Sequence, residues 1–242
     1  GDQQWMIETN AEIDGCANFY GDNVLVGSQD ATLYCLNRVD GSEIWTHQIN
    51  DQIRCSITII EDRVFVAGCD GVLHIINVAD GQKIDEVELD DVTGCTPAAI
   101  DDDVYFGTEG GTIFAINWRT PEVLWTYRHE SRSQPFRSSA AVTDELVVFG
   151  GRHQFVQALK RQNGDEAWSF PAGSRMDGSP VIVGSRAFIG TAKGWLYGLD
   201  VDSGEKVWEY EAGGGFTSSP AVAEGRLVIG NDDGALFCFG AE

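Results

Sequence analysis

Three cysteines recur about forty residues apart and could act as metal ligands. Aligned on Pro180 and Pro220, the residues Cys16, Cys55 and Cys95 fall at one position of a repeated unit. Thiolates that converge from neighbouring units are ligands that Cu(I) and Zn(II) favour. Alternatively, the three cysteines replace serine in a tightly packed position, because an uncoordinated cysteine behaves as a small apolar residue. The sequence leaves both interpretations open.

Arginine and aspartate recur at the position just before these cysteines. The aligned residues include Arg54, Arg137 and Asp177, and Arg175 lies two residues before Asp177. A guanidinium group can bind a carboxylate or a phosphate through two parallel hydrogen bonds, which a lysine cannot match. We therefore consider these four residues as a site for a small anion or a peptide carboxylate. The alternative is that Asp177 only neutralises the arginines.

The longest connection in the chain is a third candidate, for protein docking. It contains Arg128, His129 and Arg132, and in the following unit Arg152 and His153 replace the usual Asp-Gly turn. Insertions in repeat proteins tend to lie on the face that binds partners. We therefore expect these five residues to contact a protein partner. The alternative is an ordinary solvated loop.

All of these candidates are positioned by a unit of about forty residues that occurs six times. The fifth unit shows its form, with four β-rich runs at residues 179–183, 186–190, 195–200 and 206–210, each bounded by a turn. Asp-Gly and Asn-Gly pairs in the turns supply the positive φ that a two-residue hairpin needs. One such sheet cannot bury both of its faces, so neighbouring units must stack. The glycines that we take to mark the period are Gly27, Gly68, Gly107, Gly150, Gly190 and Gly230.

The repeat predicts an all-β fold, a six-bladed β-propeller of four-stranded antiparallel blades that occupies residues 1–242 as a single domain. Residues 4–8 (QWMIE) match the fourth-strand pattern, whereas the last unit stops after its third run. We expect this N-terminal strand to complete the last blade and close the ring.

Tryptophans at one position of the repeat are expected to pack as wedges between blades. Asp85 stands where the second unit should have its own tryptophan. Trp118 and Trp195 fall outside this register, so we expect them at the surface. The wedge tryptophans are Trp5, Trp45, Trp125, Trp168 and Trp208.

The charge of the chain limits its partners. Its formal net charge is -22, which excludes non-specific binding to nucleic acid. Residues 119–161 nevertheless carry seven basic and four acidic residues, so an acidic partner could dock there. No apolar stretch is long enough for a membrane span, and the first residues do not resemble a leader peptide. We expect a monomeric domain, either mature or cut from a larger chain.

Residues 195–200 (WLYGLD) and 204–208 (GEKVW) resemble the pyrroloquinoline-quinone-like (PQQ-like) β-propeller repeat family. That family includes quinoprotein dehydrogenases and non-catalytic scaffolds such as the propeller lipoprotein of the bacterial outer-membrane assembly machine. The dehydrogenases typically have eight blades and an adjacent pair of cysteines over the cofactor. This sequence has six repeats and no adjacent cysteines, so the resemblance disfavours a dehydrogenase and bound PQQ.

The sequence therefore favours a non-enzymatic scaffold or ligand-sensing module that binds a protein or peptide. No cofactor is expected. A propeller that binds a metal ion or a small anion in its channel is the alternative, and a quinoprotein dehydrogenase ranks third. The resemblance implies an extracytoplasmic location, in the periplasm or cell envelope, whereas six cysteines without a disulfide-framework spacing leave the compartment open.

Overall fold

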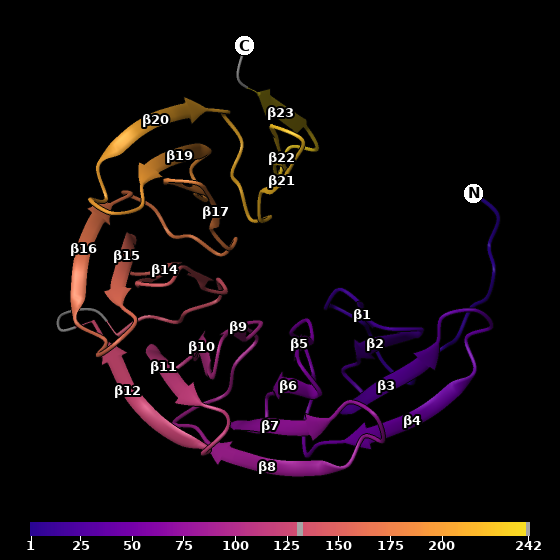
Figure 1. Cartoon of the computed structure of the whole chain (residues 1–242). Coiled ribbons are helices and arrows are strands. Elements are labelled where there is room, and N and C mark those ends of the chain that lie inside the picture. The colour runs from indigo at the N-terminus through magenta and orange to yellow at the C-terminus, as the bar shows by residue number, and fades with distance from the viewer. Residues whose placement is uncertain (130–132, 241–242) are drawn as a thin grey trace. The chain divides into compact units, whose positions relative to one another are not determined.

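The computed structural model describes residues 1–129 and 133–240, and all of their regular structure is β. These residues form 23 strands in six antiparallel sheets, and each sheet consists of consecutive strands (Figure 1). The predicted all-β class is confirmed. In the part of the chain described, no helix is long and apolar enough to cross a membrane. The backbone packs into two compact units, residues 1–104 with 116–123 and residues 105–115 with 124–242.

The first unit contains two complete four-stranded sheets. In both, a short first strand pairs with the second, and the order continues to the fourth. The first strands of consecutive sheets lie next to each other, as β1 and β5 do. The strands are β1 (Asn18–Tyr20), β2 (Asn23–Gly27), β3 (Thr32–Asn37), β4 (Glu43–Gln48), β5 (Thr58–Ile60), β6 (Arg63–Ala67), β7 (Val72–Asn77) and β8 (Lys83–Glu88).

The third sheet repeats the same order of four strands. Its strands are β9 (Ala98–Ile100), β10 (Asp103–Gly107), β11 (Thr112–Asn117) and β12 (Glu122–Arg128).

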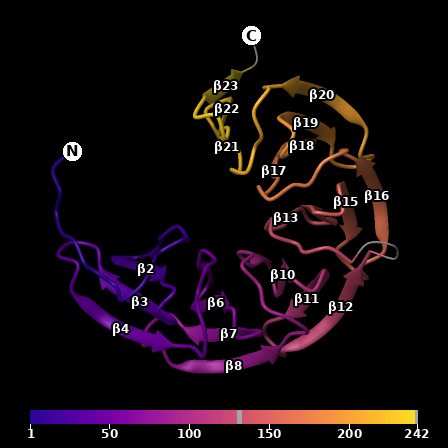
Figure 2. The same cartoon turned by 180° about the vertical axis from the view of Figure 1, so that it is seen from behind.

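The second unit contains two more four-stranded sheets and one sheet of three strands. The fifth sheet has the order β17-β18-β19-β20, and these four strands are labelled in the view from behind (Figure 2). The first strands are again neighbours. The strands are β13 (Ala141–Val142), β14 (Leu146–Gly150), β15 (Phe155–Lys160), β16 (Glu166–Pro171), β17 (Val181–Val183), β18 (Arg186–Gly190), β19 (Trp195–Asp200), β20 (Lys206–Glu211), β21 (Ala221–Ala223), β22 (Arg226–Gly230) and β23 (Leu236–Gly240).

The core lies between consecutive sheets. In the second unit, Val148 and Val156 of the fourth sheet pack with Ile189 and Leu199 of the fifth sheet, and all four side chains are fully buried. A sheet that is apolar on both faces needs such neighbours, because one sheet alone would leave its apolar side chains in water. The stacking predicted from the repeat is therefore present within the unit.

The period differs by one residue from the predicted one in the second repeat. β6 ends at Ala67, which occupies the place of Gly27 at the end of β2 and of Gly107 at the end of β10. Gly68 lies one residue further along, in the turn. The position was misread because a glycine happens to follow the small residue that ends the strand. The steps between repeats are therefore 40, 40, 43, 40 and 40 residues.

The predicted wedge role is confirmed for Trp45, Trp125 and Trp168. The indole of Trp168 donates a hydrogen bond of 2.7 Å to the carbonyl of Val201 in the next sheet. Its ring lies against Gly204, where a Cβ would come within 2.5 Å of the ring. Gly204 has a φ of 71° and forms the predicted hairpin turn. Glycine is therefore required there both by the backbone conformation and by the ring that covers it.

The second repeat has an aspartate where the others have the wedge tryptophan. Asp85 pairs with Ile75 at the register position of the wedge tryptophans. Trp118, which was expected at the surface, is only 4% exposed and packs against Phe65 with ring centroids 5.8 Å apart. Its indole donates to the carbonyl of Asp101. The expectation for Trp118 was wrong because the register of the repeat does not reveal its packing against Phe65 of the neighbouring sheet.

The closing strand is not shown by the structure. Residues 4–8 lie outside the regular strands, and the sixth sheet has three strands within the described residues. Trp5 nevertheless contacts the first repeat as a wedge does. Its indole donates a hydrogen bond of 2.8 Å to the carbonyl of Arg38, and its ring lies against Gly41. Completion of the last blade by this segment stays a prediction.

Candidate functional site

The candidate site is built where two connections of each repeat meet. One is the turn between the second and third strands, and the other is the connection that leads into the first strand. In the fourth and fifth repeats the backbone N–H of Arg152 donates to the carbonyl of Pro135, and that of Ala192 donates to the carbonyl of Arg175. These backbone bonds fix where the side chains at the two connections begin.

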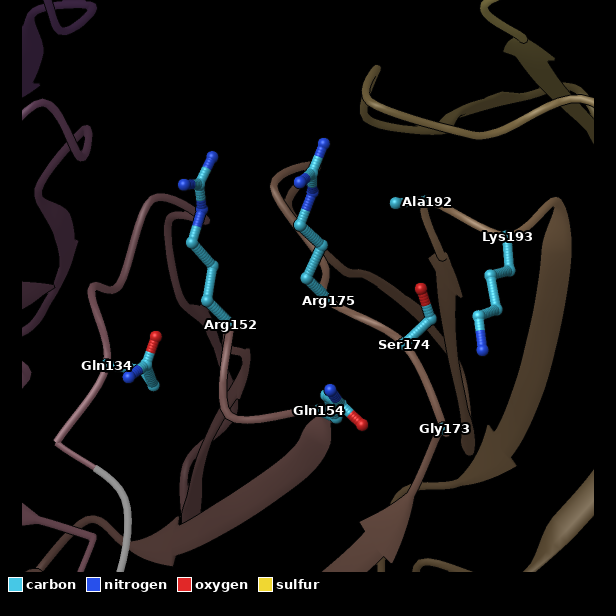
Figure 3. A pocket seen from close by; sticks show the side chains of 8 residues that line it. All are labelled: Gln134, Arg152, Gln154, Gly173, Ser174, Arg175, Ala192 and Lys193. Atoms are coloured by element: carbon cyan, nitrogen blue, oxygen red, sulfur yellow. The ribbon is translucent and has the colours of Figure 1, made fainter.

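A pocket of about 530 Å³ lies at these connections in the second unit. Most of the residues that line it are polar, and three of them are basic. Figure 3 shows the side chains of Arg152 and Arg175 extending side by side in one direction, whereas the side chain of Lys193 extends in the opposite direction. The lining residues are Gln134, Arg152, Gln154, Gly173, Ser174, Arg175, Ala192 and Lys193.

Asp177 holds the two arginines of the pocket in place. Its carboxylate accepts 2.7 Å and 2.9 Å hydrogen bonds from Nε and Nη2 of Arg152, and Nε of Arg175 lies 3.5 Å from the same carboxylate. The hydrogen bond to Asp177 raises the pKa of Arg152, against the opposing effect of its partial burial. One carboxylate thus orders two guanidinium groups, and the group of these three residues keeps a net positive charge.

Gln154 adopts a backbone conformation that other repeats assign to glycine. Its φ is 76°, and the equivalent turn residues Gly71, Gly111 and Gly194 have φ values of 73°, 82° and 83°. A non-glycine residue in this left-handed region is strained. Because this turn residue is glutamine and not glycine, an amide side chain lies at the wall of the pocket.

Of the predicted anion-site residues, the structure brings Arg175 and Asp177 together and adds Arg152 to them. Arg137 instead pairs with Glu109, with 2.9 Å between Nε and Oε1. The guanidinium of Arg54 donates two hydrogen bonds to the side-chain oxygen of Gln52.

The five predicted docking residues have different environments. Arg152 lines the pocket, and Arg128 is exposed, where it donates to the hydroxyl of Thr112. His129 is partly exposed and stacks on Phe155. Arg132 lies outside the described residues.

His153 does not lie at a docking surface, contrary to the prediction. It is 1% exposed, and its Nε2 lies 2.6 Å from Oε1 of Gln157. Its ring also packs against Phe136, with centroids 5.3 Å apart. The sequence placed it in a turn, but the turn directs this side chain inward, between apolar rings.

The three candidate metal ligands do not share one register position. The backbone N–H of Cys16 donates to the hydroxyl of Ser56, so Cys16 corresponds to Ser56 and not to Cys55. Cys16 is exposed, whereas Cys55 and Cys95 are buried. The alignment was one residue out in the first repeat, where Gly15 holds the place of Cys55. In the described part of the chain, no three His, Cys, Asp or Glu side chains are grouped to hold a metal ion.

Cys55 instead makes a contact that serines make in other repeats. Its thiol donates to the carbonyl of Ala67, and the hydroxyls of Ser138 and Ser218 donate to the carbonyls of Gly150 and Gly230. Burial raises the pKa of the Cys55 thiol to about 11. This geometry favours the interpretation that cysteine replaces serine.

Sequence reasoning missed four of the polar residues that line the pocket, Gln134, Gln154, Ser174 and Lys193. One signal was available, because Lys193-Gly194 stands where other repeats have Asp70-Gly71 and Asp233-Gly234. A change from acid to base in an acidic chain marks a position with another role. The remaining residues come from different connections, and only the fold brings them together.

The fold and the repeat define a class of protein, the β-propellers built from PQQ-like repeats. The family model described as "Outer membrane protein assembly factor BamB" matches residues 1–148, 84–175 and 152–242. The chain therefore belongs to this family, as its sequence motifs predicted.

Solved structures agree on the fold. The crystal structure of the computationally designed Ika8 protein has a TM-score of 0.80 and 16% identity, and the match covers 95% of this chain and 71% of that chain. The crystal structure of BamB from Moraxella catarrhalis has a TM-score of 0.65 and 18% identity, with coverage of 99% and 86%. No curated protein matches the chain. At these identities, the similarity to solved structures shows the fold alone.

Proposed function

We propose that this chain is a non-enzymatic scaffold that binds a protein partner through the connections around the basic pocket. The single observation that carries the proposal is the clustering of Arg152, Arg175 and Lys193 at one pocket of a chain whose net charge is -22. Loops on a rigid sheet framework are suited to recognition, because the sheets fix where each loop begins and ends. Asp177 offsets one of these three positive charges, so the cluster keeps an excess of positive charge that a bound anionic group can compensate.

We further propose that the chain works in the bacterial cell envelope. Support comes from the description of its family, which names an outer membrane assembly factor. Scaffold proteins of this kind act by holding other proteins, so we expect neither a cofactor nor turnover of a substrate.

Site-specific photocrosslinking tests the scaffold proposal. Benzoylphenylalanine is introduced in place of Lys193 or, as the control, in place of Val39, a 74% exposed residue of the first unit. In cells that produce the chain, position 193 should crosslink one defined envelope protein and position 39 should not. Equal adducts from both positions, or none from either, would contradict the proposal.

A second assay tests the non-enzymatic part. The purified chain is supplied with PQQ, calcium ions and a panel of alcohols and sugars, and reduction of an artificial electron acceptor is followed. No turnover above that of heat-denatured protein is expected. Turnover that depends on PQQ would show that the chain is a dehydrogenase.

A further inference from the structure

We propose that the basic pocket takes a short extended peptide segment of the partner that carries two or more acidic side chains. This inference rests on the proposed scaffold function and names the chemistry by which the partner is recognised. It follows from the charge, the hydrogen-bonding groups and the size of the pocket, taken in turn.

The charges of the pocket call for an acidic ligand. Arg152 uses its Nε and Nη2 on Asp177, so the two hydrogens of its Nη1 remain for a ligand. Arg175 is 55% exposed and extends beside Arg152, and Lys193 lines the opposite end (Figure 3). With basic groups at both ends, the pocket is matched by two anionic groups some distance apart rather than by one.

The neutral side chains point to a peptide rather than to an inorganic anion. Gln134, Gln154 and Ser174 can each donate and accept hydrogen bonds. A phosphate dianion mainly accepts, so it can use only the N–H groups of the two glutamine amides and not their oxygens. An extended peptide backbone presents both N–H and C=O groups, which such amides can bind. The strained φ of Gln154 is consistent with this role, because it keeps one of these amides at the wall of the pocket.

The size of the pocket fits a few residues of a peptide. Its volume of about 530 Å³ is within the range of roughly 300–1,000 Å³ that is usual for small-ligand pockets. A short segment can enter it, whereas a folded domain could contact only its rim. The acidic field of the rest of the chain opposes an acidic ligand at long range, so binding must come from the local contacts.

Fluorescence anisotropy with defined peptides tests the inference on the whole chain. The probe is a labelled, N-acetylated Ala-Glu-Asp-Glu-Ala peptide, and the control is the neutral Ala-Gln-Asn-Gln-Ala peptide. The acidic peptide should bind at low salt, and the neutral one should bind at least about tenfold more weakly, because charge-assisted hydrogen bonds are lost. Inorganic phosphate is added as a competitor.

The variant Arg175→Gln should weaken binding of the acidic peptide by about tenfold or more. The matched control is Arg54→Gln, which removes the same charge from an exposed arginine of the first unit that bonds to Gln52. This control should change binding by less than about twofold, because Arg54 does not line the pocket and salt screens exposed charges that do not contact the ligand. Circular dichroism confirms that both variants are folded.

Three outcomes would overturn the inference: equal binding of the acidic and neutral peptides, equal effects of the two variants, or displacement of the peptide by phosphate at concentrations near the peptide's own Kd. The last outcome would assign the pocket to a small anion. None of these outcomes affects the photocrosslinking result, so the scaffold proposal and the peptide inference can fail separately.

Discussion

The first and fourth repeats share one backbone contact and differ in the side chains around it. The backbone N–H of Gln29 donates to the carbonyl of Glu12, and the backbone N–H of Arg152 donates to the carbonyl of Pro135. In the first repeat the amide of Gln29 then bonds to two carboxylates. The guanidinium of Arg152 in the fourth repeat instead bonds to the carboxylate of Asp177, which lies in the connection leading into the fifth repeat.

This difference distinguishes the contacts that maintain the fold from the side chains that are available for binding. Backbone groups and wedge tryptophans recur from repeat to repeat, so they maintain the framework. The side chain that projects from the turn changes from neutral Gln29 to basic Arg152 while the backbone contact stays the same. They are therefore available for recognition, as the proposed function requires.

Removing a wedge should have the largest effect, because it breaks the framework that both regions share. Trp168→Ala empties a site that is 8% exposed and removes the hydrogen bond to Val201. We expect the free energy of unfolding to fall by about 3–5 kcal/mol, as for other buried aromatic residues. Urea denaturation followed by circular dichroism measures this loss.

Trp195→Ala is the control for this experiment. Trp195 is only partly buried and stacks on Tyr197 with ring centroids 6.1 Å apart, so its loss should be clearly smaller. Equal losses for the two variants would mean that the wedge position has no special role.

The equivalent aspartates Asp14, which precedes the first repeat's β1, and Asp177, which precedes the fifth repeat's β17, should differ in their importance for stability. Asp177→Asn removes the negative charge of a carboxylate that accepts two hydrogen bonds from Arg152. The Asp177 side chain is only 17% exposed. We expect a loss of about 1–2 kcal/mol in the free energy of unfolding. Asp14→Asn, at an exposed residue that accepts a bond from neutral Gln29, should cost less than about 0.5 kcal/mol. Equal losses, read from the same urea titrations, would remove the electrostatic distinction between the regions.

The cysteines test whether the first unit holds a metal site or only a serine-like packing position. Exposed Cys16 and Cys238 should react with a disulfide reagent at pH 8, whereas Cys55, with a pKa of about 11, should react only after unfolding. Cys55→Ser should change the free energy of unfolding by at most about 1 kcal/mol, because Ser138 makes the same contact. Stoichiometric zinc or copper in untagged protein, together with protection of Cys16, would contradict this view.

How far the sequence predicts the fold depends on how local the signal is. The hairpin turns were predicted because residues such as Gly204 act within a few positions of the chain, and the wedges because Trp168 and its equivalents keep one register. The burial of Trp118 was not predicted, because it depends on packing against Phe65 in another sheet.

The candidate site was predicted only in part, for a related reason. Arg175, Asp177 and Arg152 were each selected from charge and position, but as members of two different sites. Their association depends on the contact between two connections, which no spacing in the sequence reveals. The false alignment of Cys16 with Cys55 has the opposite cause, since a local similarity was followed where the register differed by one residue.

The smallest effect should come from relieving strain at the turn that the two regions share. Ala31 and Gln154 occupy one turn position, with φ values of 69° and 76°. Glycine at either position removes an unfavourable left-handed conformation but adds entropy to the unfolded chain, so we expect a net stabilisation of about 0.5 kcal/mol for both Ala31→Gly and Gln154→Gly. Of the two variants, only Gln154→Gly should weaken binding of the acidic peptide, because Gln154 lines the pocket and Ala31 does not. A similar gain in stability with unchanged peptide binding would mean that the amide of Gln154 takes no part in recognition, and that the two turns differ in residue type alone.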